Sequence, residues 1–253
     1  MKKVYYTFRK LCTKRNDKKL SMKDLIILGA GGASYNLIEF AEDVNSVMPT
    51  WNIFGLLDDN VKLIGKIVHG YKVLGSIDDS INYPDAYFIS SIGSATDLSM
   101  RKRVRERVPF DDSHFATLIH PLAHISRSAK IGTGTVVCPY ASIQAEAQVG
   151  HDCYINSFNH IAHEVVIGAH TVFAARSVVA SATTFGECCY IGCGSAFKHD
   201  ISIGKNCMIG MGSVIWRDIP DDSKMYAPHA RTLKESVAER SLLKQALVSS
   251  GNY

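Results

Sequence analysis

A histidine followed directly by a carboxylate is the pair of side chains in this sequence that we consider best suited to proton transfer. His163 and Glu164 form that pair. A carboxylate that holds one ring nitrogen fixes the imidazole in one tautomer, so the other nitrogen can take a proton from an attacking amine or hydroxyl. A lone His-Glu dipeptide is more often surface decoration, so its meaning depends on where the fold places it.

A six-residue period predicts how this pair is positioned. From Ile125 to Ile215 every sixth residue is apolar, over 16 consecutive hexads without an insertion. Three hexads close one triangular coil of 18 residues, so the period predicts a left-handed parallel β-helix. Glycine follows seven of the periodic residues, and we interpret these glycines as corners that require a residue tolerant of unusual φ. They are Gly132, Gly150, Gly168, Gly186, Gly192, Gly204 and Gly210.

Residues 18 apart stack on successive coils, and this register places Ser181 next to His163. The backbone N–H of Ser181 would then receive the oxyanion of a tetrahedral intermediate. Residues 191–195 and 209–213 repeat the pentapeptide Ile-Gly-Xaa-Gly-Ser one coil apart. Glycine here permits the close approach of an extended pantetheine arm, although well-formed corners explain the glycines almost equally well. The predicted edge consists of Gly192, Cys193, Gly194, Gly210, Met211 and Gly212.

The first half of the chain reads as a small Rossmann-like α/β unit. Strands alternate with helices, which predicts a parallel sheet with right-handed connections. Ligands of such sheets bind beyond the carboxyl ends of the strands. The expected strands span residues 25–28, 53–57 and 86–92, and the expected helices span residues 35–43 and 98–106.

Two short segments at the predicted carboxyl edge are candidates for ligand binding. The turn of residues 29–32, Gly-Ala-Gly-Gly, begins like a dinucleotide fingerprint, but the full GxGxxG is missing. It is either a tight strand-to-helix turn or a helix N-terminus that receives a phosphate or a sugar hydroxyl. Asp58 and Asp59 end the next strand. They either bind ribose or base hydroxyls or cap the following turn.

Charge and cysteine content narrow the class of protein. The net charge is +4, but residues 2–19 carry eight Lys or Arg against one Asp, and residues 22–253 carry 20 basic and 23 acidic side chains. The basic segment either contacts phosphates or anionic lipid or is a solvated extension before Met22. It lacks the apolar core of a signal peptide, and no stretch has the length of a membrane span. Seven cysteines without a CxxC spacing indicate reduced packing residues in a cytoplasmic protein.

Residues 156–168 read Asn-Ser-Phe-Asn-His-Ile-Ala-His-Glu-Val-Val-Ile-Gly. This segment resembles the Asn-Thr…His-Asp/Glu-Cys-Val-Ile-Gly signature of the sugar O-/N-acyltransferases of the sialic acid O-acetyltransferase and bacillosamine acetyltransferase type. The likeness covers residues 23 to about 231. It implies a nucleotide-sugar-binding α/β domain joined to a left-handed β-helix, and a homotrimer with active sites between subunits. It also implies transfer of acetyl from acetyl-CoA to a sugar without a metal.

The resemblance also implies residue roles. His163 corresponds to the general base, Glu164 to the carboxylate that raises its basicity, and Asn156 to a neighbour in the active site. Val172, Cys193 and Met211 correspond to positions near CoA, and from the coil register we expect Ser181 to lie near CoA as well. The residues that correspond to sugar-nucleotide contacts are Gly29, Gly31, Gly32, Ala33, Asp58, Asp59, Gly93 and Ser94.

Three positions depart from the family pattern. Ala33 stands where the family has a histidine after the glycine turn, and Val172 replaces a second histidine. Gly93-Ser94 replaces Gly-Asn after the third strand. The first and third changes affect expected sugar contacts, and the second removes one expected side-chain contact to CoA.

From these features we expect four parts: a basic extension (1–21), a nucleotide-sugar-binding α/β domain (22–117), a left-handed β-helix acyltransferase domain (118–231) and a tail (232–253) with an amphipathic helix, Leu233 to Leu247. The expected function is acetyl-CoA-dependent N-acetylation of a nucleotide-linked amino sugar, a 4-amino-4,6-dideoxyhexose, for bacterial surface glycans. The alternatives are O-acetylation of a sialic acid and a non-catalytic sugar-nucleotide-binding scaffold. A zinc hydratase of the β-helical carbonic anhydrase type is disfavoured, because His163 and His199 lie two coils apart.

Overall fold

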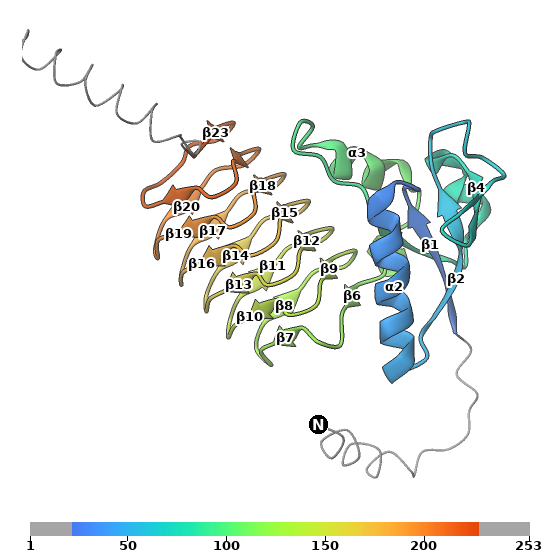
Figure 1. Cartoon of the computed structure of the whole chain (residues 1–253), viewed down its shortest axis with the longest axis horizontal. Helices are drawn as coiled ribbons and strands as arrows, with labels where there is room; N and C mark the ends of the chain where they lie inside the picture. The colour runs from blue at the N-terminus through green and yellow to red at the C-terminus, as the bar shows by residue number, and fades with distance from the viewer. Residues whose placement is uncertain (1–21, 228–253) are drawn as a thin grey trace, which may run out of the picture.

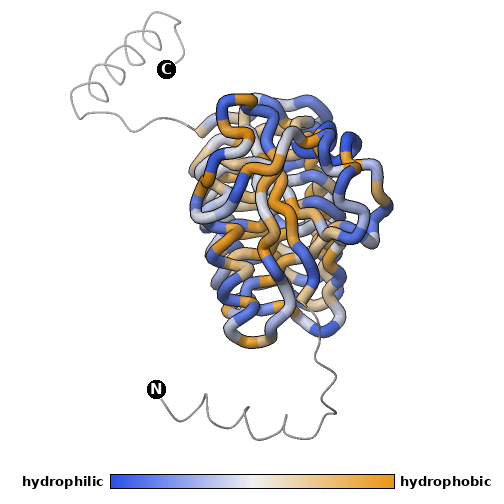
Figure 2. Tube along the Cα trace, turned by 90° about the vertical axis from the view of Figure 1, so that its right-hand side faces the viewer, coloured by the Kyte–Doolittle hydropathy of each residue, from blue (hydrophilic) through white to orange (hydrophobic). Residues whose placement is uncertain are grey.

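The computed structural model of the chain describes residues 22–227, which form an α/β domain beside a triangular prism (Figure 1). The basic extension and the predicted helix from Leu233 to Leu247 lie outside these residues. Between residues 22 and 227, no helix has the length and apolar character needed to span a bilayer. Figure 2, seen from the side of the α/β domain, shows hydrophobic segments running through its middle and hydrophilic ones along its edges.

The α/β domain contains a five-stranded sheet in the order β3-β4-β2-β1-β5, parallel except for the β3–β4 pair. The predicted parallel arrangement is therefore confirmed, whereas the β3–β4 hairpin and two 3-10 turns were not anticipated. The strands are β1 (Lys23–Leu28), β2 (Trp51–Leu57), β3 (Ile67–Val68), β4 (Tyr71–Gly75) and β5 (Tyr87–Ser90). The helices are α2 (Gly32–Val47), η1 (Ile77–Asn82), α3 (Met100–Arg107) and η2 (Asp112–His114).

The predicted left-handed parallel β-helix follows, with two-residue strands stacked into three flat sheets. We call the sheet against which the α/β domain packs the covered face. It consists of β6 (Leu118–Ile119), β9 (Val136–Val137), β12 (Tyr154–Ile155), β15 (Val172–Phe173), β18 (Tyr190–Ile191), β21 (Met208–Ile209) and β23 (Lys224–Met225).

The other two sheets are the second and third faces, in the order in which the chain reaches them. The second face consists of β7 (His124–Ile125), β10 (Ser142–Ile143), β13 (His160–Ile161), β16 (Val178–Val179), β19 (Ala196–Phe197) and β22 (Val214–Ile215). The third face consists of β8 (Lys130–Ile131), β11 (Gln148–Val149), β14 (Val166–Ile167), β17 (Thr184–Phe185) and β20 (Ser202–Ile203).

Three columns of turns form the corners between these faces. The first corner joins the third face to the covered face and includes residues 150–153, 168–171 and 186–189. The second corner joins the covered and second faces, as at 156–159 and 192–195. The third corner joins the second and third faces, as at 162–165 and 180–183. The third corner is therefore the one opposite the covered face.

The periodic residues point into the prism as predicted, and their register is 18 residues, with Ile143 paired to Ile161 and Ile161 to Val179. The stack begins at Ile119, one hexad before the periodic series that we counted from Ile125. It ends in a coil two residues shorter, in which Ile203 is bridged to Ile219.

Our explanation of the recurrent glycines is wrong. Left-handed φ values occur three residues after each periodic position from Ile131 to Ile209, mostly at residues other than glycine, such as Tyr140 (φ 63°) and Glu164 (φ 61°). The seven predicted glycines have no left-handed φ. A Cβ on any of them would lie 2.9 Å or closer to a backbone atom of the next coil, for example 2.4 Å from the Lys205 nitrogen for Gly186. Glycine is required here because consecutive coils approach each other closely.

A buried apolar cluster joins the α/β domain to the outer side of the covered face, separate from the cluster inside the prism. Leu37 of α2 and Trp51 of β2 belong to the same buried cluster as Val136, Cys138 and Tyr154 on the prism. Burial of apolar surface stabilises this boundary as it does a core within a single domain. The carboxyl ends of β1, β2 and β5 are thereby held at a defined position against the covered face.

Candidate functional site

His163 lies exposed on the third corner and is paired with Glu164. Its Nδ1 is 2.9 Å from Oε2 of Glu164, and the two side chains are 59% and 63% exposed. An ionised carboxylate only accepts hydrogen bonds, so this contact places the proton of a neutral imidazole on Nδ1. Nε2 is then the nitrogen with a free lone pair, as a general base requires.

Ser181 lies one coil away from His163 on the same corner, as the register predicted. The N–H of Ala182 donates to the carbonyl of His163 over 3.1 Å. Among residues 22–227, the N–H of Ser181 has no acceptor and is free to meet an oxyanion. Ala145 and Cys193 occupy equivalent turn positions and also have free N–H groups. A free donor is therefore a regular property of these corners.

The repeated Ile-Gly-Xaa-Gly-Ser segments lie on the second corner. Cys193 and Met211 are exposed there, and the N–H of Gly212 donates to the carbonyl of Cys193 over 2.8 Å. A Cβ at Gly194 or Gly212 would meet no atom within 4 Å, so the surface beside both residues is open. An extended chain can lie along this edge with access to backbone groups.

Asn156 and Val172 lie away from His163 in the same chain. Asn156 begins a turn of the second corner, where its side chain accepts from the N–H of Ser157 over 3.0 Å. Val172 belongs to the covered face. A Cβ placed on Gly93 would lie 3.5 Å from Val172 Cγ2, so Val172 borders the loop that follows β5.

The glycine turn after β1 combines one structurally required glycine with two that face open space. Gly29 has φ 99°, and a Cβ there would lie 2.6 Å from Ser91 Oγ. Gly31 is the N-cap of α2. A Cβ added at Gly31 or Gly32 would meet no atom within 4 Å, so the space beside both residues is open. The first N–H groups of a helix have no intrahelical acceptor. This end of α2 therefore offers free donors to an anion or a sugar hydroxyl.

Asp58 and Asp59 are both engaged within the domain. Asp58 accepts from the N–H of Ala30 over 2.7 Å and so ties the glycine turn to the end of β2. Asp59 accepts two hydrogen bonds from Arg107 and one from the N–H of Ile77. Arg107 holds the pKa of Asp59 below its usual range. Of the two interpretations from the sequence, turn stabilisation is the one these contacts match.

The candidate residues thus occupy separate places in one chain. His163, Glu164 and Ser181 lie on the third corner, whereas the glycine turn and the loop at Gly93 belong to the α/β domain, against the opposite face (Figure 1). The Cys193 and Met211 edge lies on the second corner. A single chain therefore does not bring the base and the sugar-nucleotide loops together.

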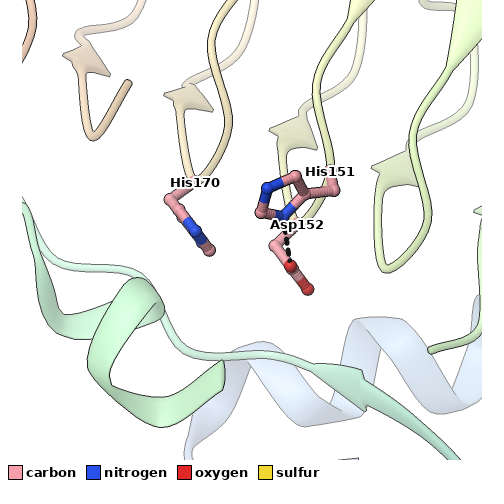
Figure 3. Close-up of side chains that lie close together, drawn as sticks. All are labelled: His151, Asp152 and His170. Carbon is pink, nitrogen blue, oxygen red and sulfur yellow. Dashed lines mark hydrogen bonds and ion pairs between the residues drawn. The ribbon is translucent and has the colours of Figure 1, made fainter. Parts of the chain in front are cut away.

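The sequence analysis missed a second histidine–carboxylate pair, at the first corner (Figure 3). His151 Nδ1 is 2.8 Å from Asp152 Oδ2, and the rings of His151 and His170 meet edge to face at 4.8 Å. The adjacency of His151 and Asp152 in the sequence was the available signal, and His199 with Asp200 repeats it. His170, 18 residues after Asp152, reaches the cluster through the coil register.

These three side chains offer ligand atoms within 4.8 Å of one another, a spacing that suits a metal ion. The positive charges around these side chains disfavour a bound metal ion. Arg105 Nε lies 3.1 Å from the same Asp152 oxygen, and the buried Arg101 donates to the backbone carbonyl of Asp152 over 2.8 Å. Two guanidinium groups beside one carboxylate leave no net negative charge for a divalent cation. We therefore interpret the cluster as a contact between the domains.

Acidification should destabilise the protein through His170. Burial lowers the pKa of His170 from 6.5 to about 4, against a smaller opposing effect of Asp152. Between these pH values the unfolded chain binds a proton that the folded chain does not, so the free energy of unfolding falls as the pH is lowered through this window. The loss reaches about 3 kcal/mol. Urea denaturation of the wild type and His170→Gln from pH 7 to 4 measures it, and an equal loss in both proteins would contradict the prediction.

Two families match the chain in the order of its two domains. The PglD N-terminal domain matches residues 24–108, and the bacterial transferase hexapeptide (six repeats) matches residues 146–181 and 182–215. A curated relative, UDP-N-acetylbacillosamine N-acetyltransferase of Bacillus subtilis (strain 168), is 33% identical over 120 residues. That alignment covers 46% of this chain and 51% of the relative, so it spans about half of the relative's length.

Solved structures match most of the chain. The acetyltransferase domain of PglB from Neisseria gonorrhoeae FA1090, in complex with acetyl coenzyme A, has a TM-score of 0.72 and 25% identity, and the match covers 84% of this chain and 100% of that one. Perosamine N-acetyltransferase from Caulobacter crescentus, in complex with CoA and GDP-perosamine, shares the fold with a TM-score of 0.68 and 22% identity, over 82% of this chain and 95% of that one. The domain matches and the PglB acetyltransferase structure confirm the resemblance drawn from the sequence: the chain joins a PglD N-terminal domain to bacterial transferase hexapeptide repeats, in the fold of the PglB acetyltransferase domain.

Proposed function

We propose that this protein is an acetyl-CoA-dependent N-acetyltransferase that acts on a nucleotide-linked amino sugar, a 4-amino-4,6-dideoxyhexose, in the synthesis of bacterial surface glycans. The observation that supports this most directly is the exposed His163–Glu164 pair on a hexapeptide prism joined to a PglD N-terminal domain. Two of the proteins named above are N-acetyltransferases, one for UDP-N-acetylbacillosamine and one for perosamine.

In the proposed reaction the sugar amine attacks the thioester carbonyl directly. As the C–N bond forms, Nε2 of His163 takes the amine proton, and Glu164 stabilises the resulting imidazolium through Nδ1. The N–H of Ser181 donates to the oxyanion. The intermediate then collapses with cleavage of the C–S bond, and CoA leaves as the thiolate. These steps use no metal and no acyl-enzyme.

The remaining residues have binding roles in this proposal. The open N-terminus of α2, at Gly31 and Gly32, receives a phosphate or hydroxyl of the sugar nucleotide. The pantetheine arm of CoA lies along the second corner, at Cys193 and Met211. The cysteines among residues 22–227 are free thiols, which supports a reducing compartment, and we place the protein in the cytoplasm.

A complete site then requires a second copy of the chain, and we predict a homotrimer. The base on the third corner and the sugar-nucleotide loops beside the covered face are on opposite sides of one prism. Trimerisation would also bury apolar side chains that are exposed on the second and third faces, such as Val178 (50%) and Val166 (39%). Light scattering should give three times the chain mass of 27.8 kDa. A monomer with full activity would overturn this arrangement.

A thiol-release assay tests the proposed function. Purified protein and acetyl-CoA are mixed with UDP-, dTDP- and GDP-linked 4-amino sugars, and with CMP-sialic and free sialic acid. We expect CoA release with one amino sugar, and release at least about 10²-fold slower in His163→Ala. Release with sialic substrates alone would show O-acetylation instead. Binding of a nucleotide sugar without any CoA release would indicate a non-catalytic scaffold.

A further inference from the structure

Arg101 is a charged side chain buried between the two domains. It is only 3% exposed, whereas arginine is seldom fully buried unless its charge and donors are matched. Burial lowers the pKa of its guanidinium, and the nearby Asp152 opposes that shift. Nη2 has no hydrogen-bond partner among residues 22–227. Its burial is thus costly and incompletely compensated.

The hydrogen bonds of Arg101 join the prism to the end of β5. Nε donates to the carbonyl of Asp152 over 2.8 Å. Nη1 donates to the carbonyl of Ile92 over 2.5 Å and, more weakly, to that of Ser90 over 3.3 Å. All three acceptors are backbone atoms, so the contacts fix the course of the chain on both sides of the domain boundary.

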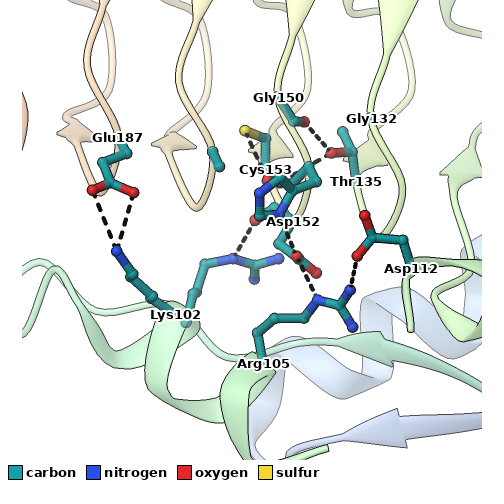
Figure 4. A network of polar contacts seen from close by, with 12 residues as sticks. Lys102, Arg105, Asp112, Gly132, Thr135, Gly150, Asp152, Cys153 and Glu187 are labelled. Atoms are coloured by element: carbon teal, nitrogen blue, oxygen red, sulfur yellow. Dashed lines mark hydrogen bonds and ion pairs between the residues drawn. The ribbon is translucent and has the colours of Figure 1, made fainter. Parts of the chain in front are cut away.

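Other residues of α3 reach the same corner of the prism (Figure 4). Arg105 contacts the Asp152 carboxylate and also bonds Asp112, and Lys102 pairs with Glu187 at 3.2 Å. The Lys102–Glu187 pair is partly exposed, at 38% and 43%, and such pairs contribute little to stability. Arg101 is the buried member of this set and the one that bonds backbone atoms of β5 as well.

The carbonyls that Arg101 holds adjoin both loops of the proposed sugar-nucleotide site. Ile92 immediately precedes Gly93 and Ser94. Ser91, between the two acceptors, donates through Oγ to the carbonyls of Leu28 and Gly29 at 3.0 and 3.2 Å, and Gly29 begins the glycine turn. A shift of Ile92 would therefore be transmitted to both loops.

Stability alone does not account for a guanidinium here. Replacing a buried ionic group with a well-packed apolar one of similar volume is often neutral or stabilising. A rigid fork that bonds three carbonyls instead specifies orientation.

We propose that Arg101 is a positioning residue that sets the sugar-nucleotide loops of the α/β domain against the prism. The inference rests on the proposed function, because it concerns the same sugar-nucleotide site. A displacement of about 1 Å in a binding loop is enough to lower catalytic efficiency strongly. His163 and Ser181 lie on the third corner, and the proposed CoA edge at Cys193 and Met211 lies on the second, so these groups would keep their positions.

The test compares Arg101→Met and Arg101→Lys with Lys102→Met, which removes the neighbouring contact on the same helix. Thiol release measures KM for each substrate, and thermal unfolding measures Tm. In Arg101→Met we expect KM for the nucleotide sugar to rise about tenfold or more, with KM for acetyl-CoA within about twofold of wild type. Arg101→Lys should show the same pattern, because lysine cannot form the fork. Lys102→Met should remain near wild type.

Equal changes in both KM values, or none, in a folded Arg101 variant would overturn the inference. If Arg101→Met does not fold, Arg101→Lys carries the test. A wild type that releases no thiol with any acceptor refutes the proposed function instead. The loops are then followed by hydrogen exchange in residues 90–95: faster exchange in the Arg101 variants than in Lys102→Met supports positioning, and unchanged exchange refutes it.

Discussion

Replacing His163 with alanine should lower kcat by about 10²- to 10⁴-fold, the usual contribution of a positioned general base. The side chain is 59% exposed, and among residues 22–227 it bonds only Glu164, so its removal leaves no cavity and no buried polar group without a partner there. Tm and the affinity for acetyl-CoA should stay at their wild-type values. The thiol-release assay measures kcat, and calorimetry measures the affinity.

His199→Ala is the matched control. His199 lies two coils further along the same corner, is exposed, and is also followed by a carboxylate, Asp200. Its removal should leave kcat within about twofold. Equal losses in the two variants would show that the corner as a whole, and not His163 as a base, is needed. Full activity in His163→Ala would refute the mechanism.

Replacing Phe185 with alanine should lower the free energy of unfolding by about 3 to 5 kcal/mol. Phe185 is 3% exposed, and its ring lies edge to face with Phe173 at 5.1 Å and with Phe197 at 5.0 Å. The substitution leaves a cavity and removes two aromatic contacts at once. In a solenoid each coil is stabilised mainly by its neighbours, so the loss falls on the middle of the prism.

Guanidinium denaturation at a fixed protein concentration checks this, since the predicted trimer makes stability depend on concentration. Phe158→Ala is the control, because Phe158 is 57% exposed on the second corner. Phe158 stacks on Tyr140 at 5.0 Å, so that variant should differ from wild type by about 1 kcal/mol or less. Equal unfolding midpoints for the two variants would contradict a core role for Phe185.

Local patterns in the sequence determined the architecture of both domains. A side chain every six residues must be apolar if it points into a narrow prism, and that requirement shows from Ile125 to Ile215 without any knowledge of distant contacts. The strand-turn-helix pattern after Asp24 likewise predicted the parallel sheet. The β3–β4 hairpin escaped prediction because β3 has only two residues, too few for a period. The glycines were located correctly but explained wrongly, since the approach of the next coil is a contact between residues 18 apart.

Tertiary structure decided which candidate residues meet. His151-Asp152 and His163-Glu164 are the same kind of dipeptide, and their sequences alone do not rank them. The His151-Asp152 pair lies on the first corner, against Arg105 and Arg101 at the boundary with the α/β domain. The His163-Glu164 pair lies exposed on the third corner. The six-residue period specifies which side chains point inward, and it is the same on every coil, so it does not distinguish one corner from another. Which corner lies against α3 depends on contacts between residues about 50 positions apart, such as Arg101 and Asp152. Those contacts follow from the packing of the two domains and not from any local pattern.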